Sequence, residues 1–369
     1  MANLMFFSLM VIFQLLTGTV AGFLDFMFLD FNEFVLAGII LLLSFFVTLF
    51  LTKKWIKSAK AAQFVGKDMN KPNKPLVPRS GGLVVTIVIC FALLLYIFMK
   101  TFSIIGIQSV NVVEAFAISA TILLAGFIGF VDDVLGWKEG LSQVQKVLLT
   151  IPIALPLTVM NVDQTIIMLP FLGNIDLQLL YPLFIVPLGV IGATNGFNLL
   201  AGYNGLEAGM GLVFFITFGF TGLLVGKLWI AFIALIACAS MLAFLLFNWF
   251  PAKVFPGNSF SYAIGALIAT LAILGNMERI ALWLFIPYYI EILLYFRARV
   301  IHKMGDVQAF AKINLDGSLE VPYNRLYDTT HIAIWFLKHV KTKVYEKDVV
   351  FFLISIQALI AIAGIMLLL

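Results

Sequence analysis

Two adjacent carboxylates, Asp132 and Asp133, end an apolar run of the chain that begins near Val113. An ionised acid at membrane depth costs on the order of 3 kcal/mol. Acids at the C-terminal end of a helix also oppose the helix dipole, so a solvated helix end explains the pair poorly. Paired carboxylates beside a phosphate-bearing substrate commonly hold Mg²⁺, a hard ion that takes oxygen ligands and keeps several waters.

Lys146 follows this pair by one short loop, in the sequence Gly140-Leu141-Ser142-Gln143-Val144-Gln145-Lys146. Ser142 and Gln145 have capping-box spacing, which predicts that a helix begins there. A lysine in the first turn of a helix is electrostatically disfavoured unless it faces an anion together with the helix end. Contact with a phosphate and a snorkelling side chain at the membrane interface explain Lys146 equally well.

A third polar segment, from Thr194 to Glu207, has three asparagines and three glycines between two apolar runs. Asn204 and Glu207 have the spacing of a helix N-cap and its N3 partner, so they could simply start the next helix. Asn195 and Asn198 are not explained in that way. Their amide oxygens could ligate a metal ion, and the glycines allow a ligand to approach the backbone closely.

Two further loops carry weaker signals. The proline-punctuated segment 247–259 is explained by an interfacial turn whose aromatic residues lie in the membrane belt. The region 297–347 is large enough for a small cap outside the membrane, and Asp316-Gly317 between two short apolar strands predicts a β-hairpin. The basic residues near the start of this region could bind lipid headgroups, but composition favours a role in topology.

The elements that position these residues are helices in a membrane, because 62% of the residues are apolar, 11% are charged and the mean hydropathy is +1.08. In lipid the backbone must satisfy its own hydrogen bonds, and the apolar runs have the length of helices rather than barrel strands. An all-α, polytopic bundle follows. The net charge of +4 comes from lysine and arginine residues in the loops between apolar runs, where they act as topology signals. We therefore expect no nucleic acid as a partner.

About ten spans are predicted within residues 31–369, and the apolar segment 1–30 is either an extra span or an interfacial helix. If the loops alternate sides, all but three of the 23 Lys and Arg residues fall on one face. The exceptions are Lys100, Lys227 and Arg279. The positive-inside rule makes the basic face cytoplasmic, and this face carries the loop 52–79 together with the polar loops 132–146, 194–207, 248–259 and 297–347. The ten runs begin near Phe34, Gly82, Val113, Val147, Leu179, Ala208, Trp229, Phe260, Ile280 and Val349.

The order of these motifs resembles that of one family, the polyprenyl-phosphate N-acetylhexosamine-1-phosphate transferases. The similarity is strongest to the eukaryal and archaeal branch, the UDP-N-acetylglucosamine–dolichyl-phosphate N-acetylglucosamine-phosphotransferases. The residues that carry it are Gly66-Lys67-Asp68-Met69-Asn70-Lys71, Pro78 with Gly81-Gly82, Gly129-Phe130-Val131-Asp132-Asp133, Asn198-Leu199-Leu200-Ala201-Gly202-Tyr203-Asn204-Gly205-Leu206-Glu207-Ala208-Gly209 and Asn248-Trp249-Phe250-Pro251-Ala252-Lys253-Val254-Phe255-Pro256-Gly257.

The resemblance implies an enzyme that moves N-acetylglucosamine-1-phosphate from a UDP-sugar to a polyprenyl phosphate and releases UMP. It implies Mg²⁺, with Mn²⁺ as a substitute. By the same resemblance, Asp132, Asp133 and Lys146 are catalytic, and Asn198, Asn258 and Asp133 are metal ligands. Gly202, Asn204 and Phe255 would hold uridine, with the phenylalanine stacked on uracil, and Asp68 and Lys71 match the first loop motif.

The chain departs from the family in two places. Asn258 stands where the family usually has Asp, so the fit to a dication is weaker by one charge. The histidine-and-arginine motif for sugar recognition is not cleanly present in the last loop. The positional candidates for that role are Arg297, Arg299, His302, Lys303 and Lys312.

Two other functions compete with this hypothesis. A transporter would explain carboxylates in the membrane, although it predicts polar residues at mid-membrane on several helices. An inactive family member that serves as a scaffold would explain Asn258. For the enzyme we expect a multi-pass protein with a cytoplasmic active site, in an archaeal plasma membrane rather than the endoplasmic reticulum, and homodimerisation is left open.

Overall fold

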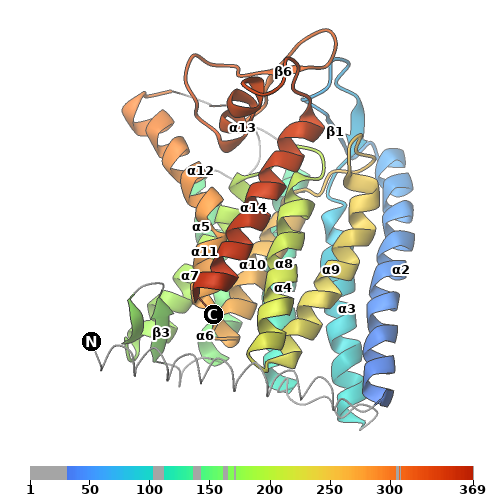
Figure 1. Ribbon diagram of the computed structural model, residues 1–369. Helices are drawn as coiled ribbons and strands as arrows, with labels where there is room; N and C mark the ends of the chain where they lie inside the picture. Colours follow the sequence, from blue (N-terminus) through green and yellow to red (C-terminus); the bar gives the residue numbers. More distant parts are fainter. Residues whose placement is uncertain are drawn as a thin grey trace.

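Long helices lie side by side in the computed structural model, which describes residues 31–102, 112–135, 143–160, 165–169, 172–304, 307 and 309–368. The strands β1 (Val65–Lys67) and β6 (Leu319–Glu320) and helix α13 (Thr329–Lys338) lie at one end of the bundle, and β3 (Ile166–Leu169) lies at the other (Figure 1). The predicted bundle of membrane helices is therefore confirmed. The predicted N-terminal segment 1–30 lies outside the described residues.

Within the described part of the chain, seven helical segments are long and apolar enough to cross a membrane. They are α2 (Phe31–Ala61), α3 (Gly82–Thr101), α4 (Val112–Leu135), a π-helical turn (Tyr181–Ile185) with α7 (Val186–Leu199), α8 (Leu206–Leu224), α9 (Leu228–Asn248) and α14 (Glu346–Leu368). The last two coincide closely with the predicted runs from Trp229 and Val349. An eighth candidate is the pair α11 (Glu278–Leu284) and α12 (Ile286–Phe296), which is bent by 52° and ends in a second π-helical turn (Arg297–Ile301).

The two remaining predicted runs form shorter helical segments. One consists of α5 (Gln143–Thr150), a 3-10 turn (Ile151–Ala154) and α6 (Leu155–Met160), and the other is α10 (Asn258–Leu274). All ten predicted runs are thus helical, but a count of ten membrane crossings stays a prediction.

The described residues form three antiparallel hairpins outside the helical bundle. The predicted hairpin at Asp316-Gly317 is confirmed: β5 (Lys312–Ile313) pairs with β6 (Leu319–Glu320), and Gly317 has a φ of +80° at the turn. The hairpin of β1 (Val65–Lys67) and β2 (Leu76–Pro78) lies at the same end of the helical bundle (Figure 1). A third hairpin, formed by β3 (Ile166–Leu169) and β4 (Gly173–Asp176), lies at the opposite end.

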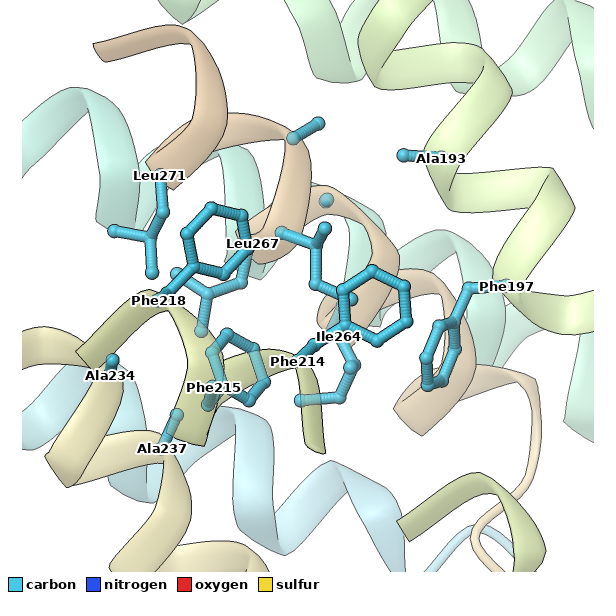
Figure 2. Packing of buried hydrophobic residues seen from close by; sticks show 14 of the residues in the cluster. Ala193, Phe197, Phe214, Phe215, Phe218, Ala234, Ala237, Ile264, Leu267 and Leu271 are labelled. Atoms are coloured by element: carbon cyan, nitrogen blue, oxygen red, sulfur yellow. The ribbon is translucent and has the colours of Figure 1, made fainter. Parts of the chain in front are cut away.

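Helix α10 lies at the centre and is buried from Ser259 to Ile273. In Figure 2, Phe214, Phe215 and Phe218 of α8 pack beside Ile264, Leu267 and Leu271 of α10. Glycines let its neighbours approach: a Cβ atom on Gly129 of α4 would overlap the carbonyl of Asn258, and one on Gly265 would overlap the backbone of α7. The N-terminus of α10 is consequently close to the end of α4, and the middle of α10 is close to the middle of α7.

The three basic residues predicted on the sparsely charged face belong to the end of the bundle that carries β3. Lys100 lies in the last turn of α3, and Lys227 precedes α9. The ammonium of Lys227 donates to the carbonyl of Gly275 at 2.6 Å, which ties the α8–α9 turn to the turn before α11. Arg279 lies in the first turn of α11, so the structure agrees with the predicted separation of charge.

Candidate active site

The carboxylate of Asp133 holds the start of the central helix. It accepts hydrogen bonds from the Ser80 hydroxyl at 2.6 Å and from the backbone N–H groups of Asn258 at 2.9 Å and Ser259 at 3.2 Å. The N-cap residue of α10 is Gly257, with a φ of +75° and no side chain to cap the helix. Asp133 therefore supplies the missing cap from another helix and benefits from the helix dipole.

Asp132, the other member of the pair, faces a different set of partners. Its Oδ2 atom accepts from the Lys146 ammonium at 2.7 Å and from the Asn258 side-chain amide at 2.6 Å. The side chain of Asp132 is 2% exposed and that of Lys146 is 18% exposed. Three predicted site residues from α4, α5 and α10 thus meet at one carboxylate oxygen. The capping box predicted for Lys146's helix includes Ser142, which lies outside the described residues.

Asn198 reaches the same helix end from α7. Its Oδ1 atom accepts from the hydroxyl of Ser261 at 2.5 Å, and Ser261 follows Asn258 by three residues, about one helical turn. Asn195 has a structural partner instead, because its amide donates to the Thr150 hydroxyl at 3.0 Å and to the Ile191 carbonyl at 2.9 Å. Of the two asparagines considered as metal ligands, only Asn198 is thus held at the start of α10.

The residues of this cluster fit a magnesium ion that is shared with a substrate. Among the described residues, no group of three or more His, Cys, Asp or Glu side chains could hold a metal ion. Mg²⁺, however, commonly binds through one or two protein carboxylates together with substrate phosphates and waters. Asp132 with the amide oxygens of Asn198 and Asn258 offers such a set. Asp133 as a metal ligand stays a prediction, and its hydrogen bonds give it a second role.

A second polar cluster gathers the first loop motif and the asparagine-rich segment. The amide of Asn204 donates to Oδ2 of Asp68 at 3.0 Å, and the Lys71 ammonium lies 3.3 Å from the same oxygen. Lys71 also forms an ion pair with Glu346. The capping role considered for Asn204 is wrong: Gly205, with a φ of +83°, is the N-cap of α8, which leaves the Asn204 side chain to bind Asp68.

Glu346 is the functional candidate that the sequence motifs miss. It is the first residue of α14, and its Oε1 atom accepts from the backbone N–H of Asn204 at 2.7 Å. Its only signal in the sequence is an acid at the start of an apolar run. Such an acid is favourable at any helix N-terminus, so the pattern does not distinguish it from a structural residue.

The β1–β2 hairpin connects the two clusters. Asp68 follows β1, and the carbonyl of Pro78 in β2 accepts from the Phe255 backbone N–H at 2.8 Å. The half-buried ring of Phe255 lies next to Gly66 and therefore packs on this hairpin. Gly202 instead lies beside the ring of Phe310. A shared uridine site for Gly202, Asn204 and Phe255 stays a prediction.

The candidates for sugar recognition lie on the turn after α12. Arg297 donates to the carbonyl of Leu326 at 2.9 Å, and its guanidinium lies over the Tyr327 ring. The ring of His302 lies 3.1 Å from Arg325, while Arg299 lies over Tyr295. Lys303 follows with a φ of +48°. These contacts fold the loop against α12, and a role in sugar recognition stays a prediction for these four residues and for Lys312 in the β5 strand.

An apolar groove of about 330 Å³ begins beside the first cluster. Its lining runs from Tyr181 on the π-helical turn to Gly196 on α7, two residues before Asn198, and its far end reaches Glu278 on α11. Helix α10 forms the floor and α11 with α12 the other wall. Three glycines line it on α7, and a Cβ atom on Gly192 would meet no atom within 4 Å. The groove is therefore open along its middle.

Polar groups at one end of a membrane bundle, with an apolar groove leading to them, define a membrane enzyme that joins a water-soluble substrate to a lipid. Comparisons with known proteins agree with this class. The sequence pattern of glycosyl transferase family 4 matches residues 115–276. The chain belongs to this family, and the resemblance to polyprenyl-phosphate N-acetylhexosamine-1-phosphate transferases is confirmed.

Three relatives carry names from this family. A Saccharolobus solfataricus protein, named as a UDP-N-acetylglucosamine–dolichyl-phosphate N-acetylglucosaminephosphotransferase, is 35% identical over 89% of this chain and 95% of its own. A Sulfolobus acidocaldarius protein with the same name is 36% identical over 72% of this chain and 79% of its own. A phospho-N-acetylmuramoyl-pentapeptide-transferase of Petrotoga mobilis is 33% identical over 65% of this chain and 75% of its own.

Proposed function

We propose that this chain transfers N-acetylglucosamine-1-phosphate from UDP-N-acetylglucosamine to a polyprenyl phosphate of the dolichyl type. An oxygen of the lipid phosphate attacks the sugar-bearing phosphorus of the donor, the bond to UMP breaks, and UMP leaves. The product is a sugar linked to the lipid through pyrophosphate. The names of the archaeal relatives support the two substrates.

The observation that carries this proposal is the position of the groove. Its lining ends at Gly196 on α7, two residues before Asn198, and Asn198 bonds Ser261 one turn into α10, the helix that Asn258 begins beside Asp132. A polyprenyl chain in the groove would place its phosphate at that cluster, where the charged nucleotide can arrive from water. A transporter would instead need a path through the bundle, whereas α10 fills the centre of the described part with buried side chains.

Phosphoryl transfer depends on in-line positioning and on neutralising charge more than on covalent help. The acceptor phosphate is already an anion and needs little help from a base. Lys146, held by Asp132 at 2.7 Å, is the cation that we assign to the reacting phosphates. Asp133 keeps the α10 terminus and therefore Asn258 in place. When bound, Mg²⁺ (or Mn²⁺) would neutralise phosphate charge, with Asp132, Asn198 and Asn258 as its protein ligands.

The charge distribution supports a cytoplasmic active site. The polar clusters lie at the end of the bundle that the positive-inside rule assigns to the cytoplasm, and the sparsely charged end carries Lys227 and Arg279. Because the Saccharolobus and Sulfolobus relatives are archaeal, we place the protein in an archaeal plasma membrane.

Purified protein, UDP-N-acetylglucosamine, Mg²⁺ and a short polyprenyl phosphate test the proposal directly. We expect release of UMP together with a lipid-linked sugar pyrophosphate, and loss of both when EDTA removes the metal. Replacing Mg²⁺ with Mn²⁺ should restore turnover. If no UDP-amino-sugar yields UMP, the enzyme is excluded and the scaffold function is favoured; turnover in EDTA would refute the metal requirement alone.

A further inference from the structure

Glu346 joins the last helix to the asparagine-rich loop. It is the first residue of α14, and its side chain is 2% exposed. One carboxylate oxygen accepts the backbone N–H of Asn204 at 2.7 Å, and the other binds the ammonium of Lys71. A single side chain therefore holds two segments that are far apart in the sequence.

The contacts close into a ring of four residues. Lys71 lies 3.3 Å from Asp68, Asp68 accepts the side-chain amide of Asn204 at 3.0 Å, and Asn204 returns to Glu346 through its backbone. The ammonium of Lys71 also lies 4.3 Å from the centre of the Phe250 ring. Because Asp68, Asn204 and Glu346 are all buried, losing one member would leave another polar group without its partner at low dielectric.

The ring fixes a loop whose backbone is unusual. Gly202 and Gly205 have φ angles of +96° and +83°, on either side of Asn204. The side chain of Asn70, next to Lys71, donates to the Gly202 carbonyl at 3.1 Å, so the first loop holds this segment at two points. The loop conformation thus depends on contacts that Glu346 completes.

A separate pocket lies beside the four-residue ring of Asp68, Lys71, Asn204 and Glu346. It has a volume of about 330 Å³ and is lined by both polar and apolar side chains, among them Lys71, Lys74 and Phe310. Phe310 is also the neighbour of Gly202. A pocket with lysines and an aromatic ring suits a nucleotide, whereas the apolar groove on α7 suits the lipid.

We infer that Glu346 is a positioning residue for the nucleotide-sugar donor, which it serves by fixing Lys71 and the Gly202–Gly205 loop. The inference rests on the proposed transferase function and assigns Glu346 to one of its two substrates. Glu346 acts through its neighbours and touches no reacting atom. Its removal should weaken donor binding and leave acceptor binding unchanged.

The decisive variant is Glu346→Gln, which keeps an oxygen for the Asn204 N–H but loses the ion pair with Lys71. We expect the KM for UDP-N-acetylglucosamine to rise roughly tenfold, because breaking a buried ion pair is costly. The KM for polyprenyl phosphate should stay within about twofold. Asp348→Asn is the matched control: it lies on the same helix and pairs with Lys341 at 2.8 Å, outside the ring. It should leave both KM values unchanged.

The conservative variant Glu346→Asp keeps the charge and should recover part of the donor affinity. In the double variant Glu346→Gln, Lys71→Met, the donor KM should match that of Lys71→Met alone, because both substitutions break the same ion pair between Lys71 and Glu346. Equal effects on both KM values, or a loss of thermal stability with both KM values unchanged, would overturn the inference. If Glu346→Gln does not fold, Glu346→Asp takes its place, and it should raise the donor KM above that of wild type while leaving the acceptor KM unchanged. Absence of UMP from the wild-type protein would instead refute the transferase function.

Discussion

Gly192→Leu should separate long lipid acceptors from short ones. Gly192 lies midway along α7, where an added Cβ atom meets nothing within 4 Å, and it faces a groove of about 330 Å³. Leucine is a better helix former than glycine by roughly 0.5–1 kcal/mol, so the folded protein should be at least as stable as wild type. The new side chain would occupy space that the polyprenyl chain needs.

The expected loss follows from steric crowding rather than from the hydrophobic effect. A polyprenyl chain that enters the groove leaves lipid that is equally apolar, so its affinity comes from packing. Overfilling a packed apolar site costs about 1–3 kcal/mol, which corresponds to a fall of about 5- to 150-fold in kcat/KM. An acceptor with a single isoprene unit should not reach Gly192 and should react as with wild type.

The assay is UMP release from wild type and variant with acceptors of increasing length. Gly38→Leu on α2 is the control, because its added Cβ atom also meets nothing within 4 Å and α2 does not line the groove. It should leave kcat/KM unchanged for every acceptor. The groove assignment is refuted if Gly192→Leu slows short and long acceptors equally, or slows neither.

Asn258→Asp would place a second carboxylate 2.6 Å from Asp132, so we expect tighter Mg²⁺ activation together with a lower Tm in EDTA, measured by metal titration and thermal unfolding; unchanged metal affinity would argue against Asn258 as a ligand. Asp133→Asn weakens the cap of α10 and should cost about 1–2 kcal/mol of stability, with an unchanged Tm counting against the capping role. Tyr181→Phe removes the hydrogen bond of 2.6 Å to Glu278 at the far end of the groove. The acceptor length at which kcat/KM levels off should then increase, and an unchanged profile would exclude a role in limiting chain length.

The first cluster could be predicted because its members lie at helix ends that the sequence places on one face. Asp132 ends α4, Asn258 begins α10, and Asn198 lies in the last turn of α7. Counting the apolar runs and letting the loops alternate sides is enough to place such residues at one membrane interface. Their pairing was not predictable, since a motif reports neither that Asp133 would cap α10 nor that Lys146 would bind Asp132.

The second cluster was less accessible to sequence reasoning because its contacts are long-range. Glu346 and Lys71 are 275 residues apart, and neither residue's local pattern indicates the other. Asn204 shows the opposite failure: its local spacing suggested a helix cap, but the contact with Asp68 and the left-handed Gly205 took precedence. The β1–β2 hairpin also lacks an Asp-Gly signal like the one at Asp316-Gly317, because the long segment 68–75 joins its strands.

The charges of the two clusters bear on the metal requirement. Each cluster contains two carboxylates and one lysine, so its formal charge is minus one. The first consists of Asp132, Asp133 and Lys146, and the second of Asp68, Glu346 and Lys71. Each lysine already forms an ion pair with a carboxylate of its own cluster. The substrates are themselves anions. A nucleotide pyrophosphate should therefore bind weakly unless a dication arrives with it, and the donor KM should fall as Mg²⁺ rises, most steeply at low ionic strength. Steady-state kinetics over a range of Mg²⁺ concentrations measure this linkage, and a donor KM that does not respond to Mg²⁺ would show that Lys71 and Lys146 neutralise the phosphates without it.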